Sequence, residues 1–159
     1  MCIRDSLWDV NNVTSGSGGN GMSYEIPPEA LQDEEFARMI REAEKYLGYP
    51  YVWGGASPST SFDCSGFVYW CLNQAGVKQG YMTSKTWRSV TKYKKLSSMS
   101  DIRKGDVIVF KMSSSKGHVG IAISDSMMVD ASSGQGEVVR RSFKTDYWRK
   151  YFYCAYRIF

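Results

Sequence analysis

Two side chains in this sequence have the types needed for nucleophilic catalysis at a carbonyl group, Cys64 and His118. Cys64 lies in an aromatic and glycine-rich stretch, residues 48–77, where an amphipathic helix is predicted to begin. The amino end of a helix carries a partial positive charge, which favours a thiolate over a thiol. His118 is the only histidine in the chain, so any cysteine–histidine chemistry has to use it. We therefore expect Cys64 to be the nucleophile and His118 the base.

The neighbours of Cys64 help to distinguish a reactive cysteine from a packing one. A lone cysteine at the start of a helix is more often a small buried apolar side chain. Here Asp63 and Ser65 make the approach polar, and Gly66 is expected to give a substrate backbone room to come close. The glycines and proline in residues 54–58 form a loop that is costly to keep unless its shape matters. These neighbours favour the reactive cysteine.

A third residue is needed to orient the imidazole. His118 begins the run H-V-G-I-A-I, at the edge of a predicted strand. The alternative to a catalytic role is an ordinary histidine that packs in the core or lies on the surface. Asp130 lies in the next predicted strand, and an antiparallel hairpin would bring it beside His118. Asp125 is the less favoured candidate, because S-D-S is typical of the hairpin turn itself.

The remaining cysteines do not indicate a metal site. The chain has four cysteines, none of them in a C-x-x-C pair, and a single histidine, which makes a zinc site unlikely. Two disulfides are formally possible. However, Cys71 falls in a hydrophobic helix and Cys154 in an aromatic run, so both are predicted to be buried apolar side chains. No cofactor is expected.

Composition limits the class of protein. The chain has 159 residues, of which 43% are hydrophobic, and this suits one compact domain with a tail. The net charge of +4 is spread along the sequence, so nucleic-acid binding is not indicated, although a mildly basic surface suits an anionic substrate. No apolar run is long enough to span a membrane, and the start lacks a signal-peptide pattern. The chain can still be a piece of a longer protein.

The pattern along the chain predicts an α+β domain behind a linker. Residues 1–23 contain a Gly/Ser/Asn tract typical of an interdomain linker, which implies an upstream domain, and residues 24–159 form the expected domain. A helix is expected from Pro27 and Pro28 to Gly48, a second from Cys64 to Gly76, and a short third from Thr83 or Ser84 through Val90. Strands are expected at Val107–Phe110, His118–Ile123, Met127–Ala131, Glu137–Ser142 and Tyr153–Ile158. Their short connections favour an antiparallel sheet.

Four motifs together carry a family resemblance. Y-V-W-G-G, F-D-C-S-G-F-V, K-G-D-V-I-V-F and H-V-G-I-A-I occur in this order over roughly residues 43–159. The stretch resembles the NlpC/P60 family of cell-wall cysteine peptidases, the C40 type. Within that family it most resembles the C-terminal domain of two-domain wall hydrolases of conjugative elements, in which a lysozyme-like domain precedes a linker.

The resemblance implies roles for particular residues. Cys64 matches the family's nucleophile and His118 its general base, while Asp130 falls where the family often has a second histidine or another polar residue. Tyr51 matches a tyrosine that lines the site and assists the oxyanion together with the Cys64 N–H. Asp63 and Ser65 match positions that contact the substrate's amine or peptide groups. The implied fold is papain-like, with the cysteine helix packed on the sheet that carries the histidine.

The resemblance also implies an activity and a location. The expected reaction is cleavage of peptidoglycan stem peptides between the γ-carboxyl of D-glutamate and the following diamino acid, either meso-diaminopimelate or L-lysine, by a secreted or wall-associated bacterial enzyme. Two alternatives remain open. One is a wall amidase or acyltransferase with the same cysteine–histidine pair, and the other is a catalytically silent wall-binding module.

The chain departs from the family pattern in the helix after the cysteine helix. Met82 and Trp87 stand where many members have an arginine and a glutamine, and that arginine can face a substrate carboxylate. Arg88 or Lys85 are the candidate substitutes.

The aromatic residues fall into two groups with different expected roles. One group is expected to line a cleft, and it consists of Tyr49, Tyr51 and Trp53. The other is expected to pack the last strand and its approach, and it consists of Trp148, Tyr151, Phe152, Tyr153 and Tyr156. The basic residues Lys92, Lys94 and Lys95 are expected on a solvated face, with contact to an anionic wall polymer as the minority interpretation.

Overall fold

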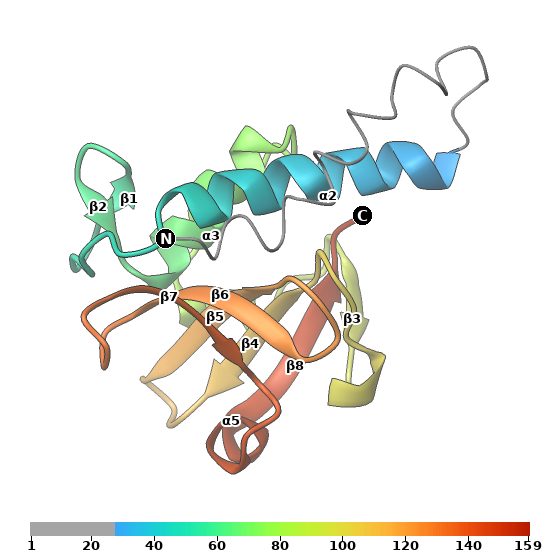
Figure 1. Ribbon diagram of the computed structural model, residues 1–159. Coiled ribbons are helices and arrows are strands. Elements are labelled where there is room, and N and C mark those ends of the chain that lie inside the picture. The colour runs from blue at the N-terminus through green and yellow to red at the C-terminus, as the bar shows by residue number, and fades with distance from the viewer. Residues whose placement is uncertain (1–27) are drawn as a thin grey trace.

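The computed structural model describes the backbone of residues 28–159 and the side chains from Glu35 onward (Figure 1). The predicted linker in residues 1–23 and Cys2 lie outside the described residues. The numbering of the helices starts at α2.

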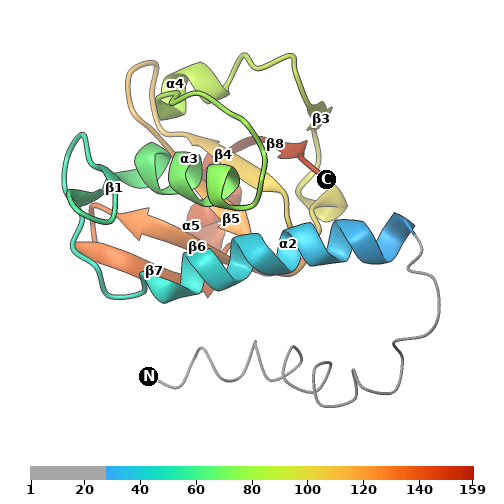
Figure 2. The same cartoon turned by 90° about the horizontal axis from the view of Figure 1, so that it is seen from above.

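Helices and sheet form layers. Helices α2 (Pro28–Lys45), α3 (Cys64–Gln74) and α4 (Ser84–Trp87) lie on one face of a six-stranded sheet, and helix α5 (Asp146–Tyr151) lies on the other (Figures 1 and 2). A small hairpin of β1 (Ala56–Ser57) and β2 (Ser61–Phe62) precedes α3, and a 3-10 turn, η1, spans Met99–Asp101. The predicted α+β class is confirmed.

The large sheet is antiparallel throughout, as predicted. Its strands lie in the order β3-β8-β4-β5-β6-β7. Their bounds are β3 (Lys94–Leu96), β4 (Val107–Lys111), β5 (Gly117–Ala122), β6 (Met127–Ser132), β7 (Glu137–Ser142) and β8 (Phe152–Arg157). Five of these strands match the expected ones to within a residue or two at each end, because alternating and apolar runs bounded by turn residues are strong strand signals.

The pleat of the sheet divides its side chains between two cores. Val119 and Ile121 of β5 face the helices and pack with Phe67 and Leu72 of α3. On the opposite face, Ala122 belongs to a second cluster that includes Trp148 of α5. The even-numbered residues of β5, His118 among them, therefore share the face on which α5 packs.

The two cysteines predicted to be packing residues are buried. Cys71 and Cys154 have no exposed surface, and both are free thiols in the helix-side core. That prediction is confirmed.

Two ion pairs hold the outer elements to the sheet. Arg140 of β7 donates to Glu44 of α2 at 3.2 Å, and Arg157 of β8 donates to Asp106 at 2.8 Å. Because both carboxylates are almost fully buried, each needs its guanidinium partner.

Some elements differ from the expectation. Helix α4 ends at Trp87 rather than at Val90, while β3 and the one-and-a-half-turn helix α5 were not expected. Lys94 and Lys95 are exposed, as predicted, but they lie on the edge strand β3. Elements this short carry too few residues to establish a period.

Gly66 has a different role from the one expected. A Cβ at this position would lie 1.9 Å from the carbonyl oxygen of Gly55, so the glycine lets helix α3 approach the 54–56 loop. The space that was expected to admit a substrate backbone is filled by the protein's own backbone.

We predict that Gly66→Ala destabilises the fold by about 1–3 kcal/mol, because backbone atoms must move to accept the methyl group. Gly80→Ala is the matched control, since Gly80 is exposed and a Cβ there meets nothing within 4 Å. Urea unfolding followed by circular dichroism measures both. Equal stability of the two variants would contradict the close contact.

Candidate active site

Cys64 is the first residue of helix α3, as the sequence predicts. The helix is capped by Asp63, whose Oδ1 accepts the backbone N–H of Gly66 at 2.6 Å. Cys64 is a free thiol with 8% of its surface exposed. The cap fixes the first turn, and the thiol therefore lies at the positive end of the helix.

His118 and Asp130 are hydrogen-bonded across neighbouring strands. His118 Nε2 lies 2.7 Å from Asp130 Oδ2, and both residues are buried. Strands β5 and β6 pair in a register that sets Gly120 opposite Asp130, and a Cβ at Gly120 would lie 3.2 Å from that of Asp130. Because Gly120 has no side chain, the imidazole of His118 can reach diagonally from β5 to the Asp130 carboxylate on β6. Asp125 is exposed in the β5–β6 turn, so it is not the partner.

The hydrogen bond to Asp130 determines which ring nitrogen is free. A carboxylate accepts the proton on Nε2, so Nδ1 is the nitrogen left to interact with the thiol of Cys64. This arrangement brings together the three residues that the sequence nominated, on α3, β5 and β6.

The surroundings of His118 favour its charged form. Burial lowers the pKa of the imidazole, but the hydrogen bonds to Asp130 and Cys64 and the negative charges of both outweigh it and raise the pKa to about 9. His118 is therefore an imidazolium, a proton donor, at neutral pH.

Arg141 is a part of the site that the sequence analysis missed. Its Nε and Nη2 donate to the two oxygens of Asp130 at 3.1 and 2.5 Å, a bidentate pair. Val139 lies opposite Asp130 in the β6–β7 register, which puts Arg141 diagonally beside it on the same face. The hairpin register could have found this residue, since a short connection was expected between the strands at Met127–Ala131 and Glu137–Ser142.

Trp148 is the second residue that was missed. It was expected only to pack the approach to the last strand, yet its ring lies 5.4 Å from that of His118 at an interplanar angle of 27°. The guanidinium of Arg141 lies over the same indole, 4.7 Å from its centre. Trp148 therefore covers both partners of the Asp130 carboxylate, the imidazole of His118 and the guanidinium of Arg141.

Asp63 and Ser65 belong to a polar cluster next to Cys64. Asp63 Oδ2 accepts the N–H of Gly54 at 3.0 Å and the hydroxyl of Tyr81 at 3.3 Å, while Ser65 Oγ lies 3.1 Å from the Tyr81 hydroxyl. These contacts tie the 54–56 loop and the segment before α4 to the start of α3. Tyr81, which is 44% exposed, was not foreseen as a neighbour of the site.

Tyr51 stays protonated near the thiol. Burial, followed by the negative charges of Cys64, Asp63 and Tyr81, raises its pKa to about 12. Its hydroxyl is therefore a hydrogen-bond donor at neutral pH, the form that oxyanion stabilisation requires.

The two positions that depart from the family pattern do not open onto a common cleft. Trp87 is buried and stacks with Tyr93, and Met82 is half-buried against the helix-side core. The guanidinium of Arg88 donates to the carbonyls of Ser114 and Lys116 at 3.0 and 2.9 Å. Arg88 is therefore a brace for the β4–β5 loop, and these contacts give no support to the suggestion that it replaces a carboxylate-binding arginine.

Lys85, the other suggested substitute, is exposed on α4.

The aromatic side chains follow the prediction in part, since four of the second set, Trp148, Tyr151, Phe152 and Tyr156, lie in or against the two cores. Trp53 is 88% exposed, whereas Tyr49 packs edge-on against Tyr46. In the second set Tyr156 is fully buried, but Tyr153 is 40% exposed, with two lysines over its ring. Sequence position alone did not separate the cleft from the core.

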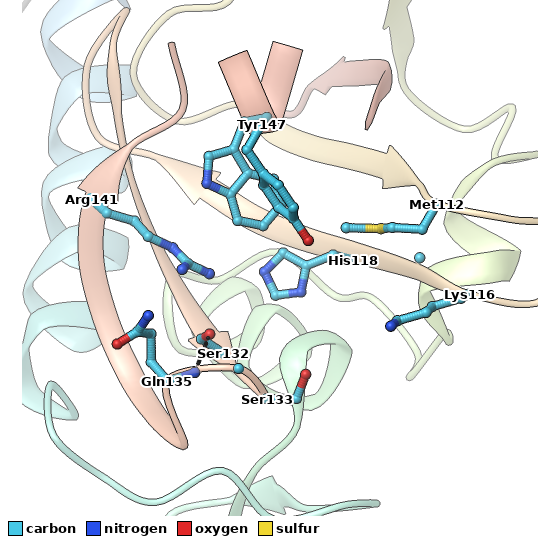
Figure 3. Close-up of a pocket in the computed structure, with 11 residues that line it drawn as sticks. Met112, Lys116, His118, Ser132, Ser133, Gln135, Arg141 and Tyr147 are labelled. Atoms are coloured by element: carbon cyan, nitrogen blue, oxygen red, sulfur yellow. Dashed lines mark hydrogen bonds between the residues drawn. The ribbon is translucent and has the colours of Figure 1, made fainter. Parts of the chain in front are cut away.

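A cavity of about 400 Å³ opens beside His118 (Figure 3). It lies between α5, the β4–β5 loop and the β6–β7 turn. Its lining consists of Met112, Lys116, Gly117, His118, Ser132, Ser133, Gly134, Gln135, Arg141, Tyr147 and Trp148. Within residues 28–159 we find no cluster of three or more side chains able to hold a metal ion, and none of the helices described there is long and apolar enough to cross a membrane.

We predict that the single histidine resonance of the protein titrates near pH 9, and that Asp130→Asn lowers this pKa by about one to three pH units. Proton NMR can follow this titration without resonance assignment, because the chain has only one histidine. The raised pKa also means that protonated His118 stabilises the fold fully below about pH 6.5, and that this stabilisation is lost as the pH rises through about 9.

Asp125→Asn, in the exposed turn, is the control and should leave the titration unchanged. A histidine that titrates near 6.5 in the unmodified protein would refute the assignment of the charged form.

We predict that Arg141→Met costs about 2–4 kcal/mol of stability, because it removes two hydrogen bonds from a buried carboxylate while the guanidinium itself is only partly buried. Arg103→Met is the control, since that arginine is exposed. Urea unfolding at pH 7 compares them. Similar losses in both variants would show that Arg141 does not support Asp130.

Comparison with known proteins agrees with this geometry. Residues 48–157 match the model of the NlpC/P60 family. The chain is 40% identical over 123 residues to the probable endopeptidase p60 of Listeria grayi, which covers 77% of this chain and 20% of that protein. It is 30% identical over 141 residues to the bifunctional muramidase/DL-endopeptidase CwlT of Bacillus subtilis, covering 87% of this chain and 41% of that protein.

Solved structures show the same fold. The NlpC/P60 domain of the peptidoglycan hydrolase SagA is 31% identical and superposes with a TM-score of 0.62 over 77% of this chain and 98% of that one. An NLP/P60 lipoprotein-like structure from Staphylococcus aureus is 26% identical and gives a TM-score of 0.66 over 92% of this chain and 47% of that one.

The curated relatives are longer proteins. This chain spans between about a fifth and two fifths of the length of those named above. The match over residues 48–157, together with the cysteine at the head of α3 and the histidine on β5, places the chain in the NlpC/P60 family.

Proposed function

We propose that this chain is a peptidoglycan hydrolase, a cysteine endopeptidase that uses Cys64 as nucleophile, His118 as general acid and base, and Asp130 to orient the imidazole. The observation that carries the proposal is the 2.7 Å hydrogen bond from His118 to Asp130, on an imidazole that also interacts with the thiol at the start of α3. A cysteine placed only for packing would need neither partner.

The chemistry follows from the protonation states. The Cys64 thiolate attacks the carbonyl carbon of the scissile amide, and the oxyanion accepts hydrogen bonds from the Cys64 N–H and the Tyr51 hydroxyl. Protonated His118 gives the proton on Nδ1 to the leaving amine. Water then attacks the thioester, His118 takes its proton, and the thiolate is released with the acid product.

The proposed substrate is the stem peptide of peptidoglycan, cut between the γ-carboxyl of D-glutamate and the diamino acid. The names of two relatives support this bond, since one is a γ-DL-glutamyl hydrolase and another a DL-endopeptidase, both of Bacillus subtilis. Such a substrate lies outside the cytoplasmic membrane, so we place the protein at the wall or in the medium, as part of a longer chain with a further domain upstream. In this proposal Asp63 and Ser65 line the acyl side of the cleft, and their mutual contacts through Tyr81 hold them there.

We predict that Cys64→Ala lowers the rate of stem-peptide cleavage by about 10⁴-fold or more while the circular dichroism spectrum is unchanged. Cys71→Ala is the matched control, because Cys71 is equally a free thiol on α3 but is fully buried. Mass analysis of digested muropeptides identifies the new amino terminus and so separates this bond from an amidase product. Retained cleavage in Cys64→Ala would refute the nucleophile.

Iodoacetamide at neutral pH distinguishes the enzyme from a silent wall-binding module. Burial raises the pKa of the Cys71 thiol well above its usual value and also raises that of Cys154. Of these three thiols, Cys64 should therefore be alkylated first. Equal or absent labelling of Cys64 would count against a reactive thiol.

A further inference from the structure

The cavity beside His118 lies on only one side of the proposed catalytic residues. His118 forms one wall together with Trp148, whose ring stacks with the imidazole. The β6–β7 turn with Ser133 and Gln135 forms another wall, and Lys116 lies at the β4–β5 loop (Figure 3). Neither Cys64 nor Tyr51 lines it. The cavity therefore extends from the imidazole away from the acyl side of the thiol.

The charge of the cavity has one sign. Its lining contains three cationic groups, Lys116, Arg141 and the protonated His118, and neither an aspartate nor a glutamate. Arg141 and His118 are both committed to Asp130. Lys116 forms no ion pair with any of the described residues, and its side chain runs toward His118 in Figure 3. It is therefore the cation left for a ligand.

The backbone of Lys116 is held in place on all sides. Its carbonyl accepts the N–H groups of Met112 and Ser113 at 2.9 and 3.0 Å and the buried guanidinium of Arg88 at 2.9 Å. Its own N–H donates to Ser113 Oγ at 3.0 Å. This brace fixes the point from which the Lys116 side chain extends, so its ammonium group stays within one side-chain length of that point.

The proposed reaction determines what enters the cavity. His118 delivers its proton to the leaving amine, so the residue that carries this amine must lie against the imidazole. In the proposed substrate that residue is the diamino acid. Its side chain ends in a carboxylate and an amine in meso-diaminopimelate, but in an amine alone in L-lysine.

We propose that this cavity is the subsite for the diamino acid on the leaving side of the bond, and that Lys116 binds the side-chain carboxylate of meso-diaminopimelate. This inference rests on the proposed function. A lysine side chain brings its ammonium group toward this cationic lining without the carboxylate that accompanies the amine in meso-diaminopimelate, so the site discriminates against it.

The test uses three tetrapeptides, L-Ala-γ-D-Glu-X-D-Ala, in which X is meso-diaminopimelate, its side-chain amide, or L-lysine. The C-terminal D-alanine occupies the α-carboxyl of X, so only the side-chain carboxylate differs. We expect kcat/KM for the diaminopimelate peptide to exceed that for the other two by about two- to fivefold, the size of one partly exposed ion pair.

Two variants assign that preference to Lys116. Lys116→Gln should remove it by slowing the diaminopimelate peptide alone, and Lys116→Glu should favour the lysine peptide. Lys78→Gln, an exposed lysine remote from the cavity lining, is the control that should retain the preference.

The outcomes separate the two proposals. Cysteine-dependent cleavage of all three peptides at equal rates, or an equal effect of Lys116→Gln on all three, would overturn the subsite and leave the peptidase standing. Failure of the unmodified protein to cleave any of the peptides would overturn the proposed function and the subsite with it.

Discussion

The buried carboxylate of Asp130 is the interaction on which the site depends. A charge with no exposed surface is costly unless it is paired and hydrogen-bonded, and Asp130 has two cationic partners, His118 on β5 and Arg141 on β7. One residue in the middle strand therefore links three strands on the same face of the sheet. The same pairing keeps Nε2 of His118 occupied and its other nitrogen available to the thiol. Trp148 closes this group from the α5 side, where it contacts both the imidazole and the guanidinium.

The thiol is positioned by a separate set of contacts. Asp63 caps α3, and the absence of a side chain at Gly66 lets the helix approach the 54–56 loop closely. The helix then packs its apolar face on β5 and β6 through residues such as Phe67 and Leu72. Because this packing sets the distance between α3 and the sheet, it also sets the relation of Cys64 to His118. Catalytic geometry of this kind depends on rigid elements, and here a helix terminus and two interior strands, β5 and β6, supply them.

The two sides of the nucleophile differ in charge and in construction. On one side, Asp63, Ser65 and Tyr81 form a polar, partly acidic group. On the other, the cavity is lined by cations, hydroxyls and aromatic rings. A substrate that is asymmetric about its scissile bond would be oriented by this difference, since a side-chain carboxylate on the leaving residue is favoured on the second side. The proposed direction of the stem peptide across the site is consistent with that asymmetry.

The sequence alone was sufficient for the parts of the site that depend on local pattern. Cys64 at a helix start, His118 at a strand edge and Asp130 one hairpin later follow from periodicity and turn residues, and the four motifs together indicated the family. Arg141, Trp148 and the brace formed by Arg88 did not follow, because their roles depend on contacts between elements far apart in the chain. Arg88 and Trp87 are adjacent in sequence, yet one supports a loop and the other fills the core. Local pattern thus nominated the residues proposed to carry the chemistry, while tertiary packing decided which side chains hold them and which cation lines the cavity, since charges and rings act over a few ångströms of space and not along the chain.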